Sequence, residues 1–288
     1  MKEPGLKERV VISSLKVLPQ HAMSAAAGKL FSLKTPKPLR KLACTTYGKV
    51  TGVDFSEVKE PLESFSSLQS FFTRELKDGA RPVDAAVDAV VSPCDGSWGA
   101  SGTITDDTAL QLKGRSYSVR MLVHDDQLAS RFEGGTFATL YLSPKDYHRF
   151  HAPVTGTVDV LRYIPGALWP VNGAGLHHVD GLFTKNERIV AWLRPSGTDG
   201  LIAMVAVGAT MVGKIQIAFD AEVTTNVHNP QATVRRYDPP MHLDKGQEWG
   251  RFLFGSTIVL LATPGTLRLD AQPEGSPLRL GRRIGTLG

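Results

Sequence analysis

The spacing of hydrophobic positions changes once along the chain, near residue 80. Before that point the apolar residues recur at helical intervals, and one apolar stripe predicts a helix over Ser64–Leu76. Ser64 or Ser66 is expected near its N-cap, and Arg81-Pro82 ends the helical region. The stripe consists of Leu68, Phe71, Phe72 and Leu76.

After Pro82, short apolar runs alternate with glycine and proline, a pattern typical of β-strands. One further helix is predicted over Ser118–Phe132. The stretch Pro165–Asn186 has no strand periodicity, and loops of this length tend to be functional or mobile. With Leu168, Trp169, Leu182 and Phe183 it is expected to be either a lid or lipid-contacting flap or an ordinary surface loop. Strands are predicted at Ala89–Ser92, Trp98–Ile104, Thr136–Leu142, Gly156–Ile164, Arg188–Leu193, Leu201–Val207, Val212–Phe219 and Thr257–Ala262.

These elements predict an α+β fold. Residues 1–60 are expected to form an N-terminal basic amphipathic helical arm, and residues 61–288 a β-rich core of antiparallel or mixed sheets. A hydrophobic content of 42% and a charged content of 21% are ordinary for a folded domain. The two cysteines, Cys44 and Cys94, make no disulfide framework, so a reducing, cytoplasmic compartment is expected.

Charge is distributed unevenly in the arm. Between Arg9 and Val53 there are eight basic residues and no acidic one. The longest charge-free run, Val17–Gly28, is interrupted by polar residues and a proline and cannot span a bilayer. Lys16 divides the only apolar stretch that resembles a signal peptide, so secretion is not expected. The pattern favours amphipathic helices on an anionic membrane surface over a solvated arm, and few aromatics are present for nucleic-acid binding.

Three clusters carry candidate chemistry. A glycine precedes a serine at Gly255-Ser256, which leaves the peptide carbonyl open to attack by the serine hydroxyl. Asp95 lies at a predicted strand-to-turn junction, and His148 and His151 follow a predicted strand. An aspartate, a histidine and a serine at strand ends can converge into a proton-relay set.

Each cluster also has a purely structural interpretation. Asp95-Gly96 forms a good turn without catalysis, and both histidines fit surface strand ends. Cys94 is expected to be a buried side chain under the turn rather than a reactive thiol. His177 and His178 are adjacent and point apart in most backbones, so no metal site is predicted.

The clusters and their surroundings resemble the phosphatidylserine decarboxylases from about Leu68 to about Leu269. One departure is Phe254, where many bacterial members have leucine before Gly-Ser-Thr. The arm before Thr46 matches only in being basic and apolar. The matching segments, in the family's order, are Phe71-Phe72-Thr73-Arg74-Glu75-Leu76, Arg81-Pro82, Pro93-Cys94-Asp95-Gly96, Tyr141–Pro153, Asn186-Glu187-Arg188, Val207–Gly213, Lys245-Gly246-Gln247-Glu248 and Gly255-Ser256-Thr257.

The resemblance implies a proenzyme that cuts itself between Gly255 and Ser256. His151, oriented by Asp95, would deprotonate Ser256, whose oxygen attacks the Gly255 carbonyl. The resulting ester would break by β-elimination and leave a pyruvoyl group at residue 256, on a small chain of residues 256–288 beside a large chain of residues 1–255.

The resemblance further implies the reaction. The pyruvoyl cofactor would form a Schiff base with phosphatidylserine and release CO₂ to give phosphatidylethanolamine. His148 would return a proton to the α-carbon or position the carboxylate. A peripheral location on the cytoplasmic face of the membrane and a homodimer are also expected, with no metal and no nucleic acid.

Three other functions fit parts of the pattern. A serine hydrolase would use Asp95, His151 and Ser256 on an external substrate and keep its chain intact. A pyruvoyl decarboxylase for a soluble amino acid would not need the basic arm. A membrane scaffold without activity would give the Gly-Ser bond no role.

Overall fold

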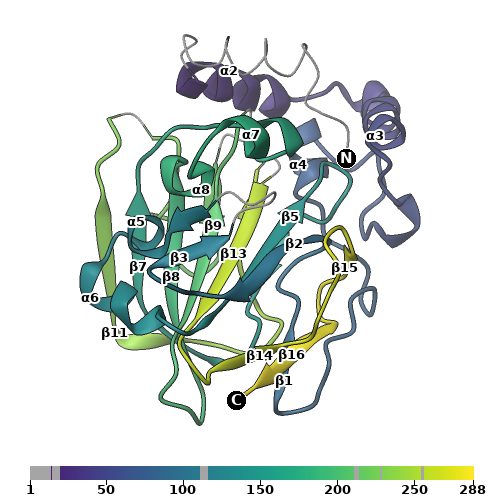
Figure 1. Cartoon of the computed structure of the whole chain (residues 1–288). Helices are drawn as coiled ribbons and strands as arrows, with labels where there is room; N and C mark the ends of the chain where they lie inside the picture. Colours follow the sequence, from purple (N-terminus) through teal and green to yellow (C-terminus); the bar gives the residue numbers. More distant parts are fainter. Residues whose placement is uncertain (1–13, 15–19, 111–115, 211–213, 228, 254–255) are drawn as a thin grey trace.

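The computed structural model describes residue 14 and residues 20–110, 116–210, 214–227, 229–253 and 256–288. Helices lie at the N-terminus and among the strands of a mostly antiparallel core, which confirms the α+β prediction (Figure 1). The helical elements are α2 (Gln20–Ser32), α3 (Lys37–Thr51), η1 (Phe55–Glu57), α4 (Leu68–Phe72), α5 (Val119–Val123), α6 (Asp126–Ala129), η3 (Ser130–Phe132), α7 (Gly173–His178) and α8 (Leu182–Lys185).

The largest sheet in the described part of the chain has eight strands in the order β11-β7-β8-β9-β13-β5-β2-β15. Its members pair antiparallel throughout. They are β2 (Gly96–Thr103), β5 (Thr136–Leu142), β7 (Gly156–Ile164), β8 (Arg188–Pro195), β9 (Ile202–Val207), β11 (Thr233–Leu243), β13 (Ser256–Ala262) and β15 (Pro277–Leu278).

The remaining strands form smaller sheets. One has the order β10-β12-β6, another the order β1-β16-β14, and β3 pairs with β4. They are β1 (Ala89–Val91), β3 (Thr108–Leu110), β4 (Ser116–Ser118), β6 (Arg149–His151), β10 (Ile215–Ile217), β12 (Glu248–Phe252), β14 (Leu267–Leu269) and β16 (Arg283–Leu287).

Both faces of the large sheet are buried. On β13, Ile258 and Leu260 belong to one hydrophobic cluster, whereas Val259 and Leu261 belong to a second. Alternate side chains of a strand point to opposite faces, so the sheet separates two cores. The first cluster includes side chains of β6, β10 and β12, and the second includes side chains of α5, α7 and α8. A strand buried on both faces needs a continuous apolar run, and Ile258–Ala262 provides one.

The arm helices lie at one end of the sheet, close to α4 and α7 (Figure 1). A small third core joins Cys44 and Val53 of this region to Phe65 and Phe71. Its members lie on both sides of the boundary at residues 60 and 61 that the sequence suggested, and that division into domains stays a prediction. No helix in the described ranges is both long and apolar enough to cross a bilayer.

The expected helices are shorter than their apolar stripes suggested. Only Leu68–Phe72 of the Ser64–Leu76 segment is helical, and its N-cap is Ser67 rather than Ser64 or Ser66. The predicted helix Ser118–Phe132 is broken because His124 adopts a left-handed conformation with φ of 54°. Two short helices and an η turn replace it.

Candidate active site

Asp95 is held at the start of β2 by the glycine that follows it. Gly96 has φ of 145°, a conformation that residues with side chains rarely adopt. A Cβ atom at this position would lie 2.1 Å from the carbonyl oxygen of Tyr141 on β5. The Asp-Gly pair therefore lets β2 approach β5 closely while Asp95 stays 6% exposed beside the sheet.

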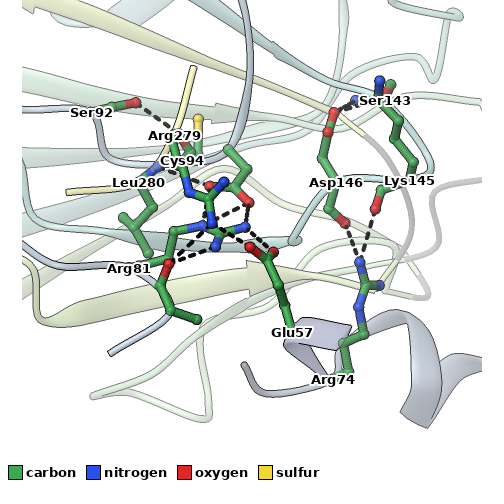
Figure 2. A network of polar contacts seen from close by, with 12 residues as sticks. Glu57, Arg74, Arg81, Ser92, Cys94, Ser143, Lys145, Asp146, Arg279 and Leu280 are labelled. Atoms are coloured by element: carbon green, nitrogen blue, oxygen red, sulfur yellow. Dashed lines mark hydrogen bonds and ion pairs between the residues drawn. The ribbon is translucent and has the colours of Figure 1, made fainter. Parts of the chain in front are cut away.

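The carboxylate of Asp95 is fully engaged. Arg81 Nε donates to its Oδ1 at 2.8 Å, and the backbone N–H of Leu280 donates to the same oxygen at 2.8 Å. Arg81 also donates to Glu57 at 2.8 Å, and Arg279 donates to Glu57 in turn. Figure 2 shows Arg81, Glu57 and Arg279 converging in this network. The charge of Asp95 is thus neutralised by an arginine, not by a histidine.

His151 is a half-buried neutral base. Its backbone N–H donates to Pro93 at 2.7 Å, and its ring Nδ1 lies 2.8 Å from the carbonyl oxygen of Gly246. A carbonyl only accepts, so Nδ1 carries the proton and Nε2 keeps a lone pair. That Nε2 is buried and has no hydrogen-bond partner among the described residues. Burial lowers the pKa of His151, which keeps the ring neutral.

His148 is buried more deeply still. Its ring stacks on Phe72 with centroids 4.0 Å apart, and Nε2 donates to the carbonyl oxygen of Ser143 at 3.0 Å. Nδ1 has no partner within the part of the chain that the structure describes. Burial first, and then the nearby Arg74 guanidinium, lower the pKa of His148 to about 3. The ring is therefore neutral at physiological pH and offers an unprotonated Nδ1.

The two histidines occupy different faces. They are three residues apart in extended chain, a spacing that points side chains to opposite sides of a strand. His148 lies on the side of Phe72, whereas His151 lines a cavity of about 290 Å³ with Arg149 and Glu248. They are consequently able to serve separate steps.

Ser256 is the first residue of β13 and pairs with Leu142 of β5. His148 contacts both chain segments that lead to this point. Its ring donates to Ser143, the residue after Leu142, and its carbonyl accepts from the N–H of Phe252 at 2.9 Å. The structure thus brings His148 close to the head of β13, while Gly255 lies outside the described residues.

Asp95 and His151 approach each other through the backbone only. His151 donates to Pro93, two residues before Asp95, but no hydrogen bond joins the two side chains in the described structure. They line neighbouring cavities, of about 140 Å³ for Asp95 and 290 Å³ for His151, that share Arg81 and Tyr147. The relay from Asp95 through His151 to Ser256 stays a prediction.

Two arginines that the sequence analysis left without a role shape this site. Arg74 is 4% exposed and donates to the backbone oxygens of Lys145 and Asp146 at 2.9 and 3.2 Å. It fixes the turn that precedes His148, as Figure 2 shows for Arg74 and the turn residues. Arg81 holds Asp95. The sequence signal for a role of Arg74 and Arg81 is their position in the Phe-Phe-x-Arg and Arg-Pro motifs.

Three buried polar atoms, two of them on the candidate histidines, lack a partner among the described residues: Nδ1 of His148, Nε2 of His151 and Oγ1 of Thr257. Such atoms are costly unless a ligand or reacting group engages them. Nδ1 of His148 is the one that a carbonyl-bearing group at the head of β13 could engage, because His148 bonds to Ser143 and Phe252 on the two segments that lead there. No cluster of metal-ligating side chains occurs within the described ranges.

The segment Pro165–Asn186 is more structured than its sequence suggested. It contains α7 and α8, and Leu168, Leu182 and Phe183 are at most 1% exposed. These three apolar side chains belong to the interior and do not present a lipid-contacting surface. Cys94 is likewise fully buried, in agreement with its structural interpretation.

Two neutral histidines, His148 and His151, and the neutralised carboxylate of Asp95 make this region the candidate active site. The family model for phosphatidylserine decarboxylase matches residues 68–286. A phosphatidylserine decarboxylase proenzyme of Anaeromyxobacter sp. (strain K) is 42% identical over 97% of this chain and 99% of its own length. A proenzyme of the same name from Myxococcus xanthus (strain DK1622) is 41% identical over 98% of this chain and 100% of its own length. The chain belongs to the phosphatidylserine decarboxylase family, a family of carboxy-lyases.

Proposed function

We propose that this protein converts phosphatidylserine to phosphatidylethanolamine and CO₂, as a step of phospholipid biosynthesis, through a pyruvoyl group made from Ser256. The observation that carries the proposal is the position of Ser256 at the head of β13, paired with Leu142, whose neighbour Ser143 accepts a hydrogen bond from the neutral His148. The proenzyme name of the relatives supports processing of a precursor.

Self-cleavage begins with the hydroxyl of Ser256. A neutral base takes its proton, and the oxygen attacks the Gly255 carbonyl carbon, so that the peptide bond is exchanged for an ester. Loss of the α-proton expels the Gly255 carboxylate by β-elimination, and hydrolysis of the resulting dehydroalanine releases ammonia. The unprotonated Nε2 of His151 makes it the proposed base, and Asp95 is the proposed orienting carboxylate.

The hydrogen bonds that Asp95 already makes restrict how it can orient His151. Arg81 and Leu280 hold the carboxylate, so it acts on His151 through its charge unless its side chain moves. Among the influences on His151, the charge of Asp95 raises the pKa, whereas burial, the strongest, lowers it. Asp95 therefore favours the protonated ring that forms transiently during the attack.

The pyruvoyl carbonyl supplies the electron-accepting chemistry when CO₂ leaves the substrate. His148 is proposed to hold the proton that this carbon then needs. Since Nε2–H is committed to Ser143, Nδ1 would take up a proton from water during turnover and deliver it to this carbon, because Nδ1 is unprotonated before the reaction. The ring of Phe72 fixes the imidazole plane.

The lipid substrate requires a site at a membrane surface. Four leucines of the arm are between 51% and 65% exposed: Leu30 on α2, Leu33 just after it, and Leu39 and Leu42 on α3. Lysines and arginines accompany them without any acidic residue, as is typical of helices that lie on anionic bilayers. We place the arm on the cytoplasmic face, and a homodimer follows only from the family resemblance.

The decisive experiment is the intact mass of the purified protein under denaturing conditions. Processing predicts a fragment of residues 1–255 and a second fragment whose first residue is a pyruvoyl group in place of Ser256. Ser256→Ala should give one uncut chain and no CO₂ from phosphatidylserine. An active wild-type protein with a single uncut mass would disprove the proposal.

The same samples distinguish the proposed decarboxylase from a serine hydrolase. That activity would leave the chain whole and Ser256 open to labelling by a fluorophosphonate. The proposed processing consumes the hydroxyl, so the mature protein should not be labelled at residue 256.

A further inference from the structure

A further cavity lies between the arm and the core. It measures about 390 Å³ and reaches from α2 to β10 and to Leu253, the residue after β12. Its lining residues are Ser24, Ala25, Gly28, Lys29, Ser32, Gln69, Lys214, Gln216, Asn226 and Leu253. Two of them are lysines, and no carboxylate is included.

Five polar side chains of this cavity have no partner among the described residues, whereas Ser32 donates to the carbonyl oxygen of Lys29. Within the described part of the chain, the ammonium groups of Lys29 and Lys214 make no ion pair or hydrogen bond. The side-chain amides of Gln69, Gln216 and Asn226 also lack partners there. Two free cations and three free amides around one hollow are the donors that an oxyanion needs.

The cavity adjoins the candidate active site through consecutive backbone contacts. Phe252 donates to the carbonyl oxygen of His148, and the next residue, Leu253, donates to the carbonyl oxygen of Lys214 at 2.9 Å. His148 and the cavity therefore flank the same end of β12, three residues before Ser256. Gln69 strengthens the link, since it lies one helical turn before Phe72, which stacks on His148.

We infer that this cavity binds the phosphodiester of the lipid headgroup, held by Lys29 and Lys214. The inference rests on the proposed function and names a binding subsite for the same reaction. The phosphate is joined to the serine moiety by one ester linkage, so a substrate that reacts at residue 256 places it close by. The exposed Leu30 and Leu33, next to Lys29 and Ser32 on α2, leave an apolar surface for the acyl chains.

The reacting carboxylate of the substrate is a poorer occupant. A lysine that paired with it would stabilise the substrate more than the transition state, in which that charge moves away, and would slow the reaction. The phosphodiester keeps its charge throughout. Each lysine therefore stabilises the bound substrate and the transition state by the same amount. Loss of such an interaction raises KM and leaves kcat unchanged.

The test uses the processed enzyme and a short-chain, monodisperse phosphatidylserine. Lys29→Gln with Lys214→Gln should raise KM about tenfold, as expected for the loss of charge-assisted hydrogen bonds, with kcat changed less than about twofold. Lys185→Gln is the matched control, because Lys185 is an exposed lysine of α8, outside both the arm and the cavity. Self-cleavage should be complete in all three proteins. Equal KM values in the double variant and the control would overturn the inference.

A second measurement distinguishes a lipid headgroup from free phosphate. Glycerol 3-phosphate and inorganic phosphate should inhibit the wild type competitively and inhibit the double variant several-fold less. If phosphate raised the wild-type Tm but the double variant kept the wild-type KM for the lipid, the cavity would be a phosphate site unrelated to substrate, and the inference would be wrong.

The phosphate measurement also separates this inference from the proposed function. A wild-type protein that stays uncut and inactive would refute the proposed function. In that protein, loss of phosphate-induced stabilisation in the double variant would still support the anion site, and an unchanged Tm shift would refute it.

Discussion

At the scale of single residues, the two histidines differ in the atom that each leaves free. His151 leaves Nε2 and His148 leaves Nδ1, and they face opposite sides of the chain at β6. Variants should therefore separate cleavage from turnover. His151→Ala should remain uncut, and His148→Ala should be cut but release CO₂ at a rate lower by about two orders of magnitude or more.

Denaturing gels measure the cleavage and CO₂ release measures the turnover. Both variants uncut, or a His151→Ala protein that is cut normally, would contradict this separation. His242→Ala serves as the control, since His242 is exposed and lies outside the site. It should be both cut and active.

The pKa of His148 gives a prediction about acid stability. Its folded-state pKa of about 3 lies below the ordinary value near 6.5, so the unfolded chain binds an extra proton between these values. Its contribution to folding stability is thus complete above pH 6.5 and is lost progressively as the pH falls towards 3. His148→Gln should show a shallower fall in unfolding free energy than wild type in this window, measured by urea denaturation.

The ion pair between Arg81 and Asp95 gives a prediction about stability. Both side chains are about 10% exposed, and Arg81→Ala would leave Asp95 and Glu57 facing each other without a cation between them. We expect the unfolding free energy to fall by about 3 kcal/mol. Arg283→Ala breaks the exposed pair with Asp88 and should cost at most about 1 kcal/mol. Equal losses in the two variants would contradict a structural role for the Arg81 network.

At the scale of elements, the sequence predicted best where one pattern dominates. β5 and β7 have the bounds that their apolar alternation predicted, Thr136–Leu142 and Gly156–Ile164. β11 was missed because it is an exposed edge strand with consecutive prolines, which disrupt pairing and create a bulge. Asp95 was expected at a strand junction and is found there. Its contact with Arg81 depends on tertiary packing, which no local pattern encodes.

The arm helices carry the prediction about membrane binding. Deletion of the arm would also remove Gln20 and His21, which bond to the backbone at Leu168 and Gly166. Point variants avoid this problem. Leu30→Glu with Leu42→Glu should abolish flotation with anionic vesicles and leave the Tm nearly unchanged, because both side chains are more than 60% exposed.

Val87→Glu provides the matched control for the arm variants. Val87 is 94% exposed but lies outside the arm. Its replacement should leave vesicle binding intact. Equal loss of flotation in Val87→Glu and in the arm variant would show that net charge, and not the arm surface, determines binding.

At the scale of the whole molecule, the segment after residue 255 is distributed through the fold. β13 lies between β5 and β9 in the large sheet, β15 pairs with β2, and β16 pairs with β1. After the proposed cleavage, the fragment of residues 256–288 should co-elute with the large chain in native size exclusion and separate only in denaturant. Dissociation of the fragments in native buffer would contradict this arrangement.

The central position of β13 would also limit the lifetime of an enzyme processed in the proposed way. The proposed cofactor would lie at the head of a strand enclosed by two neighbours and two hydrophobic cores, so it could not be renewed by exchange of the small chain. Each polypeptide would thus receive its reactive group once. Chemical damage to that group would inactivate the whole molecule permanently, so cells would restore activity only by synthesising new protein.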